Sequence, residues 1–215
     1  MVKVDLHTHS IASPDGSLDE SDYRKLLADG LDFIAVTDHN TVSFALELRE
    51  KLGPVIIVGE EITTRDGEII GLYLHEVVKA GMTAKETADA IHAQGGLVYI
   101  PHPFETVRKG LTSATLDSIA NDVDIMETRN GRAIFQNRSK QAEAWAVKHN
   151  VPGAASSDAH GRHGWGKTYS VLHSEPNVKK LPKLLYGAQL VVGSPGIRGV
   201  LYPKVNRIRR RRRGA

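Results

Sequence analysis

Cysteine is absent from this chain of 215 residues. Its absence excludes disulfides, thiolate zinc sites, iron–sulfur clusters and cysteine nucleophiles, so any bound metal must be held by imidazole and carboxylate groups. Long apolar runs are absent too, since none approaches the roughly 18 residues of a membrane-spanning helix. The N-terminal stretch MVKVDLHTHS has no apolar region of the signal-peptide type. We therefore expect a soluble, cytoplasmic protein.

A net positive charge is absent outside one segment of the chain. The formal net charge is +3, from 28 Lys and Arg against 25 Asp and Glu, but residues 207–213 alone hold six arginines. The rest of the chain has 22 basic and 25 acidic residues, a net charge of −3. Its composition is ordinary for a globular protein, and its length fits one domain. The sequence predicts a single domain over residues 1–203 and a basic, disordered tail over 204–215.

Short apolar runs alternate with amphipathic segments along the chain. The runs expected to be strands cover residues 2–6, 33–37, 55–58, 68–74, 97–100, 123–127 and 152–155, and the segments expected to be helices cover 21–29, 44–52, 84–93, 113–120 and 133–149. Such alternation indicates βαβ units and a mostly parallel sheet. Periodicity leaves both a closed barrel and an open doubly wound sheet possible. Further along, 177–187 reads as a helix, 190–192 as a last strand, and the sequence after it as loop.

Polar residues of the kind that bind metals cluster directly after the predicted strands. The clusters contain His7 and His9, Asp38 and His39, Glu60 and Glu61, His102, Asn130, and Asp158 and His160. Because the active sites of α/β barrels are built at the C-terminal ends of their strands, this placement favours a barrel with a site at that end.

Each cluster taken alone has an ordinary explanation. His7 and His9 are two residues apart and share one face of a strand, so they either bind one metal or form simple hydrogen bonds. Asp38 and Asp158 could cap helices, and adjacent Glu60 and Glu61 could lie in a solvated loop. The prolines on both sides of His102 fix its backbone. Taken together, five histidines and at least two carboxylates suit two or three divalent ions such as Zn²⁺, Mn²⁺ or Fe²⁺.

The motifs DLHTHS, DGS, AVTDHNT, VGEEI, IHAQGGLVYIPHP, METRNG and SSDAH occur in this order. The set resembles the PHP (polymerase and histidinol phosphatase) family over roughly residues 3 to 170. The resemblance implies an α/β fold, a distorted (β/α)7 barrel with a two- or three-metal site at the C-terminal ends of its strands, and phosphoesterase activity.

The resemblance also implies particular metal ligands. The first ion would be held by His7, His9 and Asp158, the second by Glu68 and His102, with Glu61 bridging these two, and the third by Asp15, His39 and His160. Glu68 stands where the family usually has a histidine, and Asp15 lies one residue further along than is common. Glu60 is the alternative to Glu61 if the register of the G-x-E motif is different.

The predicted reaction is hydrolysis of a phosphomonoester, of a small molecule or a nucleotide, by a hydroxide that bridges the metals. Arginines bind phosphate bidentately and would complete the charge clamp, and the loop candidates are Arg108, Arg129, Arg132 and Arg162. His160, or else His163, would protonate the leaving oxygen.

Three other functions fit the same residues. A nucleic-acid-directed phosphodiesterase or exonuclease could use the same metals, with the arginine tail binding the phosphate backbone. A catalytically silent metal-binding domain could serve as an interaction module. A non-phosphate amidohydrolase could share the ligand types, although no lysine at a strand end is a candidate for carboxylation. No residue identifies the leaving group or the oligomeric state.

Overall fold

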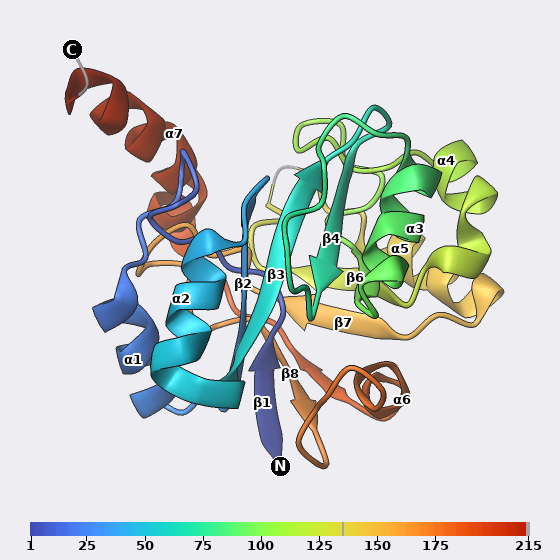
Figure 1. Ribbon diagram of the computed structural model, residues 1–215, viewed down its shortest axis with the longest axis horizontal. Coiled ribbons are helices and arrows are strands. Elements are labelled where there is room, and N and C mark those ends of the chain that lie inside the picture. The colour runs from blue at the N-terminus through green and yellow to red at the C-terminus, as the bar shows by residue number, and fades with distance from the viewer. Residues whose placement is uncertain (135, 214–215) are drawn as a thin grey trace.

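The computed structural model describes residues 1–134 and 136–213, and their strands form one nine-stranded sheet (Figure 1). The strands are β1 Val2–Asp5, β2 Phe33–His39, β3 Ile56–Thr63, β4 Glu68–Leu72, β5 Leu97–Ile100, β6 Ile125–Asn130, β7 Gly153–Ser156, β8 Tyr169–Leu172 and β9 Gln189–Val191. The helices are α1 Glu20–Ala28, α2 Ser43–Leu52, α3 Ala84–Ala93, α4 Ser113–Ser118, α5 Ser139–His149, α6 Leu181–Leu185 and α7 Gly196–Arg213, with 3₁₀ turns at Gly53–Val55 and Ala120–Asp122.

The sheet curls into a nearly closed barrel, which confirms the predicted fold class. Its strand order is β7-β6-β5-β4-β3-β2-β1-β8-β9. At the seam, the Ser170 hydroxyl of β8 donates to the carbonyl of Ala155 in β7 at 3.2 Å and accepts from its amide at 2.9 Å. These two bonds join β7, at one edge of the sheet, to β8, the strand next to the other edge. Figure 1 shows α1 and α2 on one side of the strands, and α3, α4 and α5 on the other.

The prediction of a mostly parallel sheet was wrong, because four of the eight strand pairings are antiparallel. Strands β3 and β4 are joined by only four residues, too few for the crossover that parallel strands need. They form a hairpin in which Thr63 pairs with Glu68. The start of β4 therefore lies at the rim where β3 ends, and this brings Glu68 to the C-terminal end of the barrel.

Successive residues of a strand contribute alternately to two apolar cores. Ile34 and Val36 of β2 belong to the layer between the strands and the helices, together with Leu48 of α2. Ala35, between them, packs into the other cluster, which the leucines of α6 help to close. Because successive side chains of a strand point to opposite faces, a barrel with apolar residues on both faces produces continuous apolar runs. This explains the unbroken run FIAV in the sequence.

The part of the chain after residue 130 differs most from the sequence-based expectations. Strand β8 was not expected, and α5 begins at Ser139 and not at 133; residue 135, within the expected helix, lies outside the described residues. The expected loop and disordered tail are instead the helix α7, which extends to Arg213; residues 214–215 lie outside the described residues. No helix among the described residues is long and apolar enough to cross a membrane.

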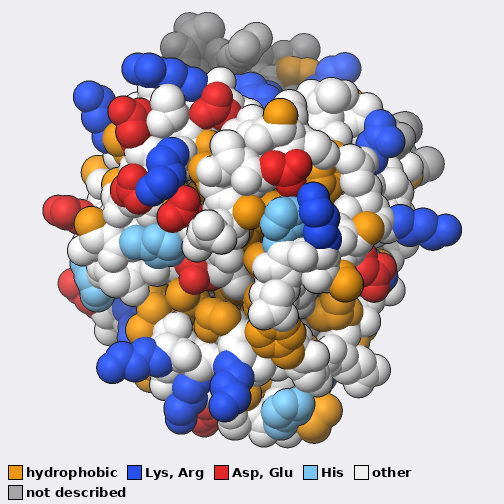
Figure 2. All heavy atoms as spheres, turned by 90° about the vertical axis from the view of Figure 1, so that its right-hand side faces the viewer, with side chains coloured by type: hydrophobic (Ala, Val, Ile, Leu, Met, Phe, Trp, Pro, Cys, Tyr) orange, Lys and Arg blue, Asp and Glu red, His pale blue; other side chains and the backbone are white. Residues whose placement is uncertain are grey.

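Surface charge on the side of α3, α4 and α5 is mixed. Figure 2 shows acidic and basic side chains interspersed on that face. This agrees with the charge balance of the sequence outside the arginine segment.

Candidate metal centre

All nine side chains predicted as metal ligands meet at one rim of the barrel. Among the described residues, four groups place one ligand atom from each member within 4.8 Å of the others. The groups are His9, Asp15, His39 and His160; His7, His102 and Asp158; His7, His9 and Glu61; and Glu61, Glu68 and His102. Their assignment to particular ions remains a prediction, but the structure does bring the whole set together.

The centre of the cluster is formed by the segment after β1. The Nε2 atoms of His7 and His9 face each other at 3.0 Å. The nearest oxygen of Asp158 lies 3.7 Å from the first of these nitrogens and 3.6 Å from the second. Glu61 of β3 places Oε1 3.6 Å from His7 Nε2 and Oε2 3.3 Å from His9 Nε2. Both carboxylates thus face a point shared by two imidazoles.

The predicted second group lies beside Glu61. His102 Nε2 is 2.9 Å from Glu61 Oε1 and 3.9 Å from Glu68 Oε2. Burial, followed by the nearby charge of Glu61, raises the pKa of Glu68 to about 7. The Glu60 alternative is not supported by the geometry. Because neighbouring strand residues face opposite ways, Glu60 points to the other side and accepts the amide of Val78 at 2.8 Å.

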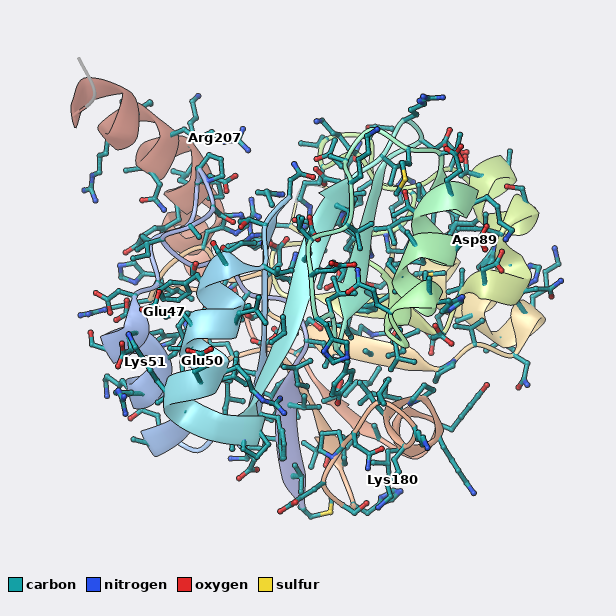
Figure 3. All side chains as sticks on the ribbon, in the orientation of Figure 1. Glu47, Glu50, Lys51, Asp89, Lys180 and Arg207 are labelled. Atoms are coloured by element: carbon teal, nitrogen blue, oxygen red, sulfur yellow. The ribbon has the colours of Figure 1, made fainter. Side chains whose placement is uncertain are left out.

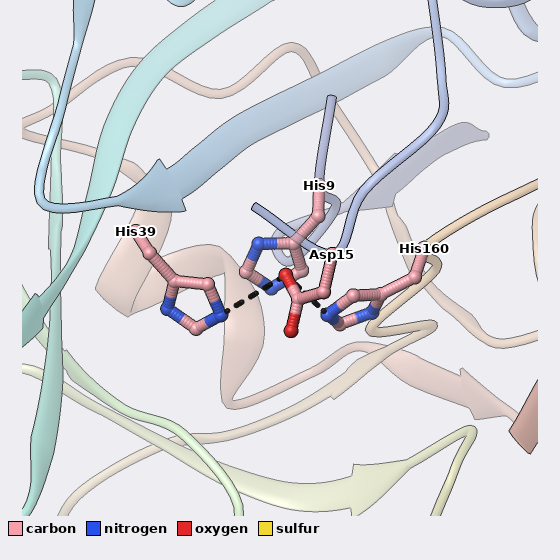
Figure 4. Close-up of side chains that lie close together, drawn as sticks. All are labelled: His9, Asp15, His39 and His160. Atoms are coloured by element: carbon pink, nitrogen blue, oxygen red, sulfur yellow. Dashed lines mark ion pairs between the residues drawn. The ribbon is translucent and has the colours of Figure 1, made fainter. Parts of the chain in front are cut away.

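The predicted third group is shown in Figure 4. Asp15 Oδ1 lies 3.5 Å from His39 Nε2 and 3.6 Å from His160 Nε2. The His9 ring lies between them, with its centroid 4.6 Å from that of His39 and 4.1 Å from that of His160. The turn that carries Asp15 is tight, since a Cβ on Gly16 would lie 2.1 Å from the carbonyl oxygen of Ser10.

A buried carboxylate that the sequence analysis did not single out supports the cluster from below. Glu127 of β6 faces His7 Nδ1 at 3.1 Å and accepts the Tyr99 hydroxyl at 3.1 Å. Its other oxygen accepts the His102 amide at 2.6 Å and the Asn130 side chain at 2.8 Å. A carboxylate on the far nitrogen of a ligand histidine fixes the ring and its tautomer. The only sequence signal for Glu127 was its place at the end of the expected strand 123–127, within the motif METRNG.

Two of the candidate ligands have unusual backbone geometry. His102 has φ 28° and Asp158 has φ 51°, in the left-handed region that non-glycine residues rarely adopt. Each such residue costs on the order of 1–3 kcal/mol, and such residues concentrate at functional sites. The fold thus retains two strained residues at the rim.

The electrostatics of the cluster are dominated by buried charge. Burial opposes ionisation of Glu61 and Asp158, but the surrounding histidines, and Arg132 beside Asp158, hold the pKa of both carboxyls well below its usual range. Burial likewise opposes protonation of His7, yet Asp158, Glu61 and Glu127 raise its pKa well above normal. Burial, with His9 and Arg132 nearby, keeps the pKa of His160 well below normal. Two carboxylates are therefore ionised, and His160 is neutral.

These residues fit divalent cations. Asp15 Oδ1 is buried and has no hydrogen-bond partner among the described residues, although two imidazole nitrogens face it. Among the described residues, the Nε2 atoms of His7 and His9 lie close to one another and to the carboxylates of Glu61 and Asp158. A set made only of imidazole and carboxylate groups suits Zn²⁺, Mn²⁺ or Fe²⁺.

Two of the predicted arginines reach the site. Arg108 pairs with Asp158 at 2.5 Å and with Glu105 at 2.6 Å, and Arg132 lies 3.1 Å from Asp158. The Nε of Arg132 is buried and has no hydrogen-bond partner among the described residues. Both arginines also line the cavity of the site, which places them to bind an anion.

The other two predicted arginines do not reach it. Arg129 binds Glu143 of α5 at 3.0 Å, and Arg162 binds Asp22 of α1 at 2.6 Å. For Arg129 the reason is a β-bulge between Glu127 and Arg129, which shifts the register. Strict alternation would put 127 and 129 on one face, but the bulge instead lets Glu127 and Asn130 both point to the site.

A cavity of about 590 Å³ opens above the cluster. Its lining includes predicted ligands, both site arginines and Lys109, and also Pro203, Lys204, Arg207 and Ile208 of α7. Figure 3 places Arg207 on this helix. Sequence reasoning left the arginine segment outside the site, and nothing in its residues indicated where the helix would pack. His163 lies beside Tyr202 of α7, with ring centroids 5.5 Å apart.

Comparisons with known proteins find relatives by sequence and by structure. No family model matches the sequence. The uncharacterized protein MJ1587 of Methanocaldococcus jannaschii is 32% identical over 150 residues, which cover 63% of this chain and 88% of that protein.

Solved structures share the fold at low identity. A two-domain protein of Bacteroides vulgatus that contains a predicted PHP-like metal-dependent phosphoesterase has a TM-score of 0.67 and 20% identity, over 96% of this chain and 69% of that one. The lesion-specific endonuclease PfuEndoQ of Pyrococcus furiosus has a TM-score of 0.64 and 18% identity, over 88% of this chain and 57% of that one.

Proposed function

Because the chain belongs to one family with MJ1587 and has the fold of the PHP-like phosphoesterases, we propose that it is a metal-dependent phosphoesterase. The observation that carries the proposal is the convergence of nine histidine and carboxylate side chains, in overlapping groups within 4.8 Å, at a cavity that Arg108, Arg132 and Arg207 also line. The neighbours named as a phosphoesterase and an endonuclease support hydrolysis of a phosphate ester.

The proposed ligands are the nine residues of the four groups, with Glu61 shared between positions. Divalent cations, when bound at such a centre, activate water and offset the charge of a phosphoryl group. Asp158 and Glu61 supply negative charge at neutral pH because their pKa values are held low. His160 serves better as a neutral ligand than as a proton donor, since its pKa is depressed.

The chain's own contribution to substrate binding comes from Arg108 and Arg132. Both guanidinium groups are anchored on Asp158, and Glu105 holds Arg108 from the other side. Anchored guanidinium groups are pre-organised for the non-bridging oxygens of a phosphate, which they can bind bidentately. We propose that these two residues orient the phosphate.

The test is metal-dependent hydrolysis by the purified full chain. Protein stripped with chelator and reloaded with Mn²⁺ or Zn²⁺ is assayed for phosphate release from a panel of small phosphomonoesters. We expect activity that requires the cation and that falls at least a hundredfold in Asp158→Asn, with Glu143→Gln as a surface control. If the wild-type protein binds the cations fully but hydrolyses none of the esters, the chain is instead a silent metal-binding domain.

A nucleic-acid substrate is the second candidate. Lys109, Lys204 and Arg207 line the cavity in addition to the two anchored arginines, and the cavity is larger than one phosphate needs. The endonuclease neighbour acts on nucleic acid by its name. Cleavage of short oligonucleotides under the same conditions, falling steeply as salt rises, would favour this candidate over a small ester.

A further inference from the structure

Helix α7 is joined to the site by three independent contacts. The buried side chain of Asn206 donates to the carbonyl of Asp15 at 2.8 Å and to that of His160 at 3.1 Å. Tyr202 packs against Gly161, where an added Cβ would lie 2.4 Å from the ring. Arg207 forms an ion pair with Asp15 at 2.6 Å. The helix therefore contacts the two loops that carry Asp15 and His160, two of the three predicted ligands of the third group.

The contact of Arg207 leaves the inward oxygen of Asp15 open. The Nη2 of Arg207 binds Oδ2 of Asp15, whereas Oδ1 faces His39 and His160 and has no hydrogen-bond partner in the part of the chain that the structure describes. A guanidinium group that blocked the cation position would bind Oδ1 of Asp15. Because an outer partner on one carboxylate oxygen fixes the direction of the other, this arrangement orients Asp15 towards the imidazoles.

We infer that α7 completes the third cation position and that Arg207 is the positioning residue for Asp15. The inference rests on the proposed function, since it assumes that this position takes a divalent cation. It assigns a role in the centre to the arginine segment, whose first member is Arg207. It also explains why Asn206 is buried in a helix that is otherwise rich in exposed basic residues.

The test is calorimetric titration of the metal-free full chain with Mn²⁺ alone. We expect the wild type to bind three ions. Arg207→Ala should weaken one of the three steps by about 10- to 100-fold, the usual effect of losing an outer partner of a ligand, and leave the other two. Asp15→Asn should weaken the same step, and the double variant should lose no more than Asp15→Asn does. Arg207→Lys should recover part of the loss if the positive charge orients Asp15.

Arg209→Ala is the matched control, because Arg209 is an exposed arginine on the same helix. It should titrate like the wild type, and circular dichroism should show the same fold for every variant. The inference is overturned if Arg207→Ala binds all three ions as tightly as the wild type, or binds any of them more tightly. It is also overturned if Arg209→Ala loses as much affinity as Arg207→Ala. Absence of cation binding by the wild type would overturn the proposed function itself, so the two failures are distinguishable.

Discussion

Glu127 provides the sharpest test of how the centre is supported. All four of its neighbours donate hydrogen bonds or can do so: Tyr99, Asn130, the His102 amide and His7 Nδ1. Glu127→Gln keeps the shape but replaces one acceptor oxygen by an amide that donates. Whichever way the amide turns, some donor loses its acceptor.

The two orientations have different costs. An amide on the side of His102 leaves its backbone N–H unpaired, at roughly 1–3 kcal/mol for a buried donor, and leaves the Asn130 side chain only its longer hydrogen bond to Asp158, at 3.3 Å. An amide on the other side is easier to accommodate, because Tyr99 can donate to Ser156 instead, at 2.7 Å. His7 must then accept at Nδ1 and carry its proton on Nε2, the atom that faces the cluster.

We therefore expect Glu127→Gln to destabilise the metal-free protein by about 1–3 kcal/mol. Cation affinity should fall by about 10- to 100-fold, because the Nε2 lone pair of His7 is no longer available. Urea denaturation measures the free energy of unfolding, and calorimetry with Mn²⁺ measures the affinity. Glu143→Gln, which removes an exposed carboxylate paired with Arg129, is the control. Wild-type affinity in Glu127→Gln would refute the reasoning.

Three further changes test other parts of the site. Asp5 is fully buried, and burial raises its pKa to about 7. The folded chain therefore holds a proton that the unfolded chain releases near pH 4. The free energy of unfolding thus falls as pH rises from about 4 to 7. Asp5→Asn should thus gain stability relative to the wild type over that range, by at most about 1.4 kcal/mol per pH unit, in urea titrations at several pH values; a flat difference would contradict the assignment. Gly161→Ala should undock α7, because the methyl group overlaps the ring of Tyr202, and limited proteolysis should then cut the C-terminal segment faster than in the wild type. Arg108→Ala should raise KM for a phosphomonoester more than it lowers kcat if Arg108 binds the phosphate, and steady-state kinetics with Arg24→Ala as control will show whether it does.

Most of the candidate centre was readable from the sequence for a physical reason. Ligand residues of a barrel follow its strands, so their positions in the chain mark the strand ends, and apolar runs mark the strands. His102 and Asp158 were found in this way. Glu68 needed the family resemblance, because a residue at the start of a strand reaches the same rim only if that strand runs antiparallel, as β4 does.

Side-chain direction was less predictable than position. Arg129 and Arg132 look equivalent in the sequence, yet a bulge in β6 turns the first towards α5 while the second reaches Asp158. Glu127 carried almost no signal, since its role depends on donors from β5 and on the segments that follow β1 and β5. Such contacts join residues up to 120 positions apart.

The sequence by itself determined the chemistry: without cysteine, and with histidines and acids after successive apolar runs, the chain can build only an imidazole and carboxylate centre. Only the tertiary structure decided what surrounds that centre. The hairpin of β3 and β4 places Glu68, the bulge in β6 excludes Arg129, and α7 brings Arg207 onto Asp15 from 192 residues away. Local patterns fix which residue types are available, whereas packing between distant segments fixes which of them meet.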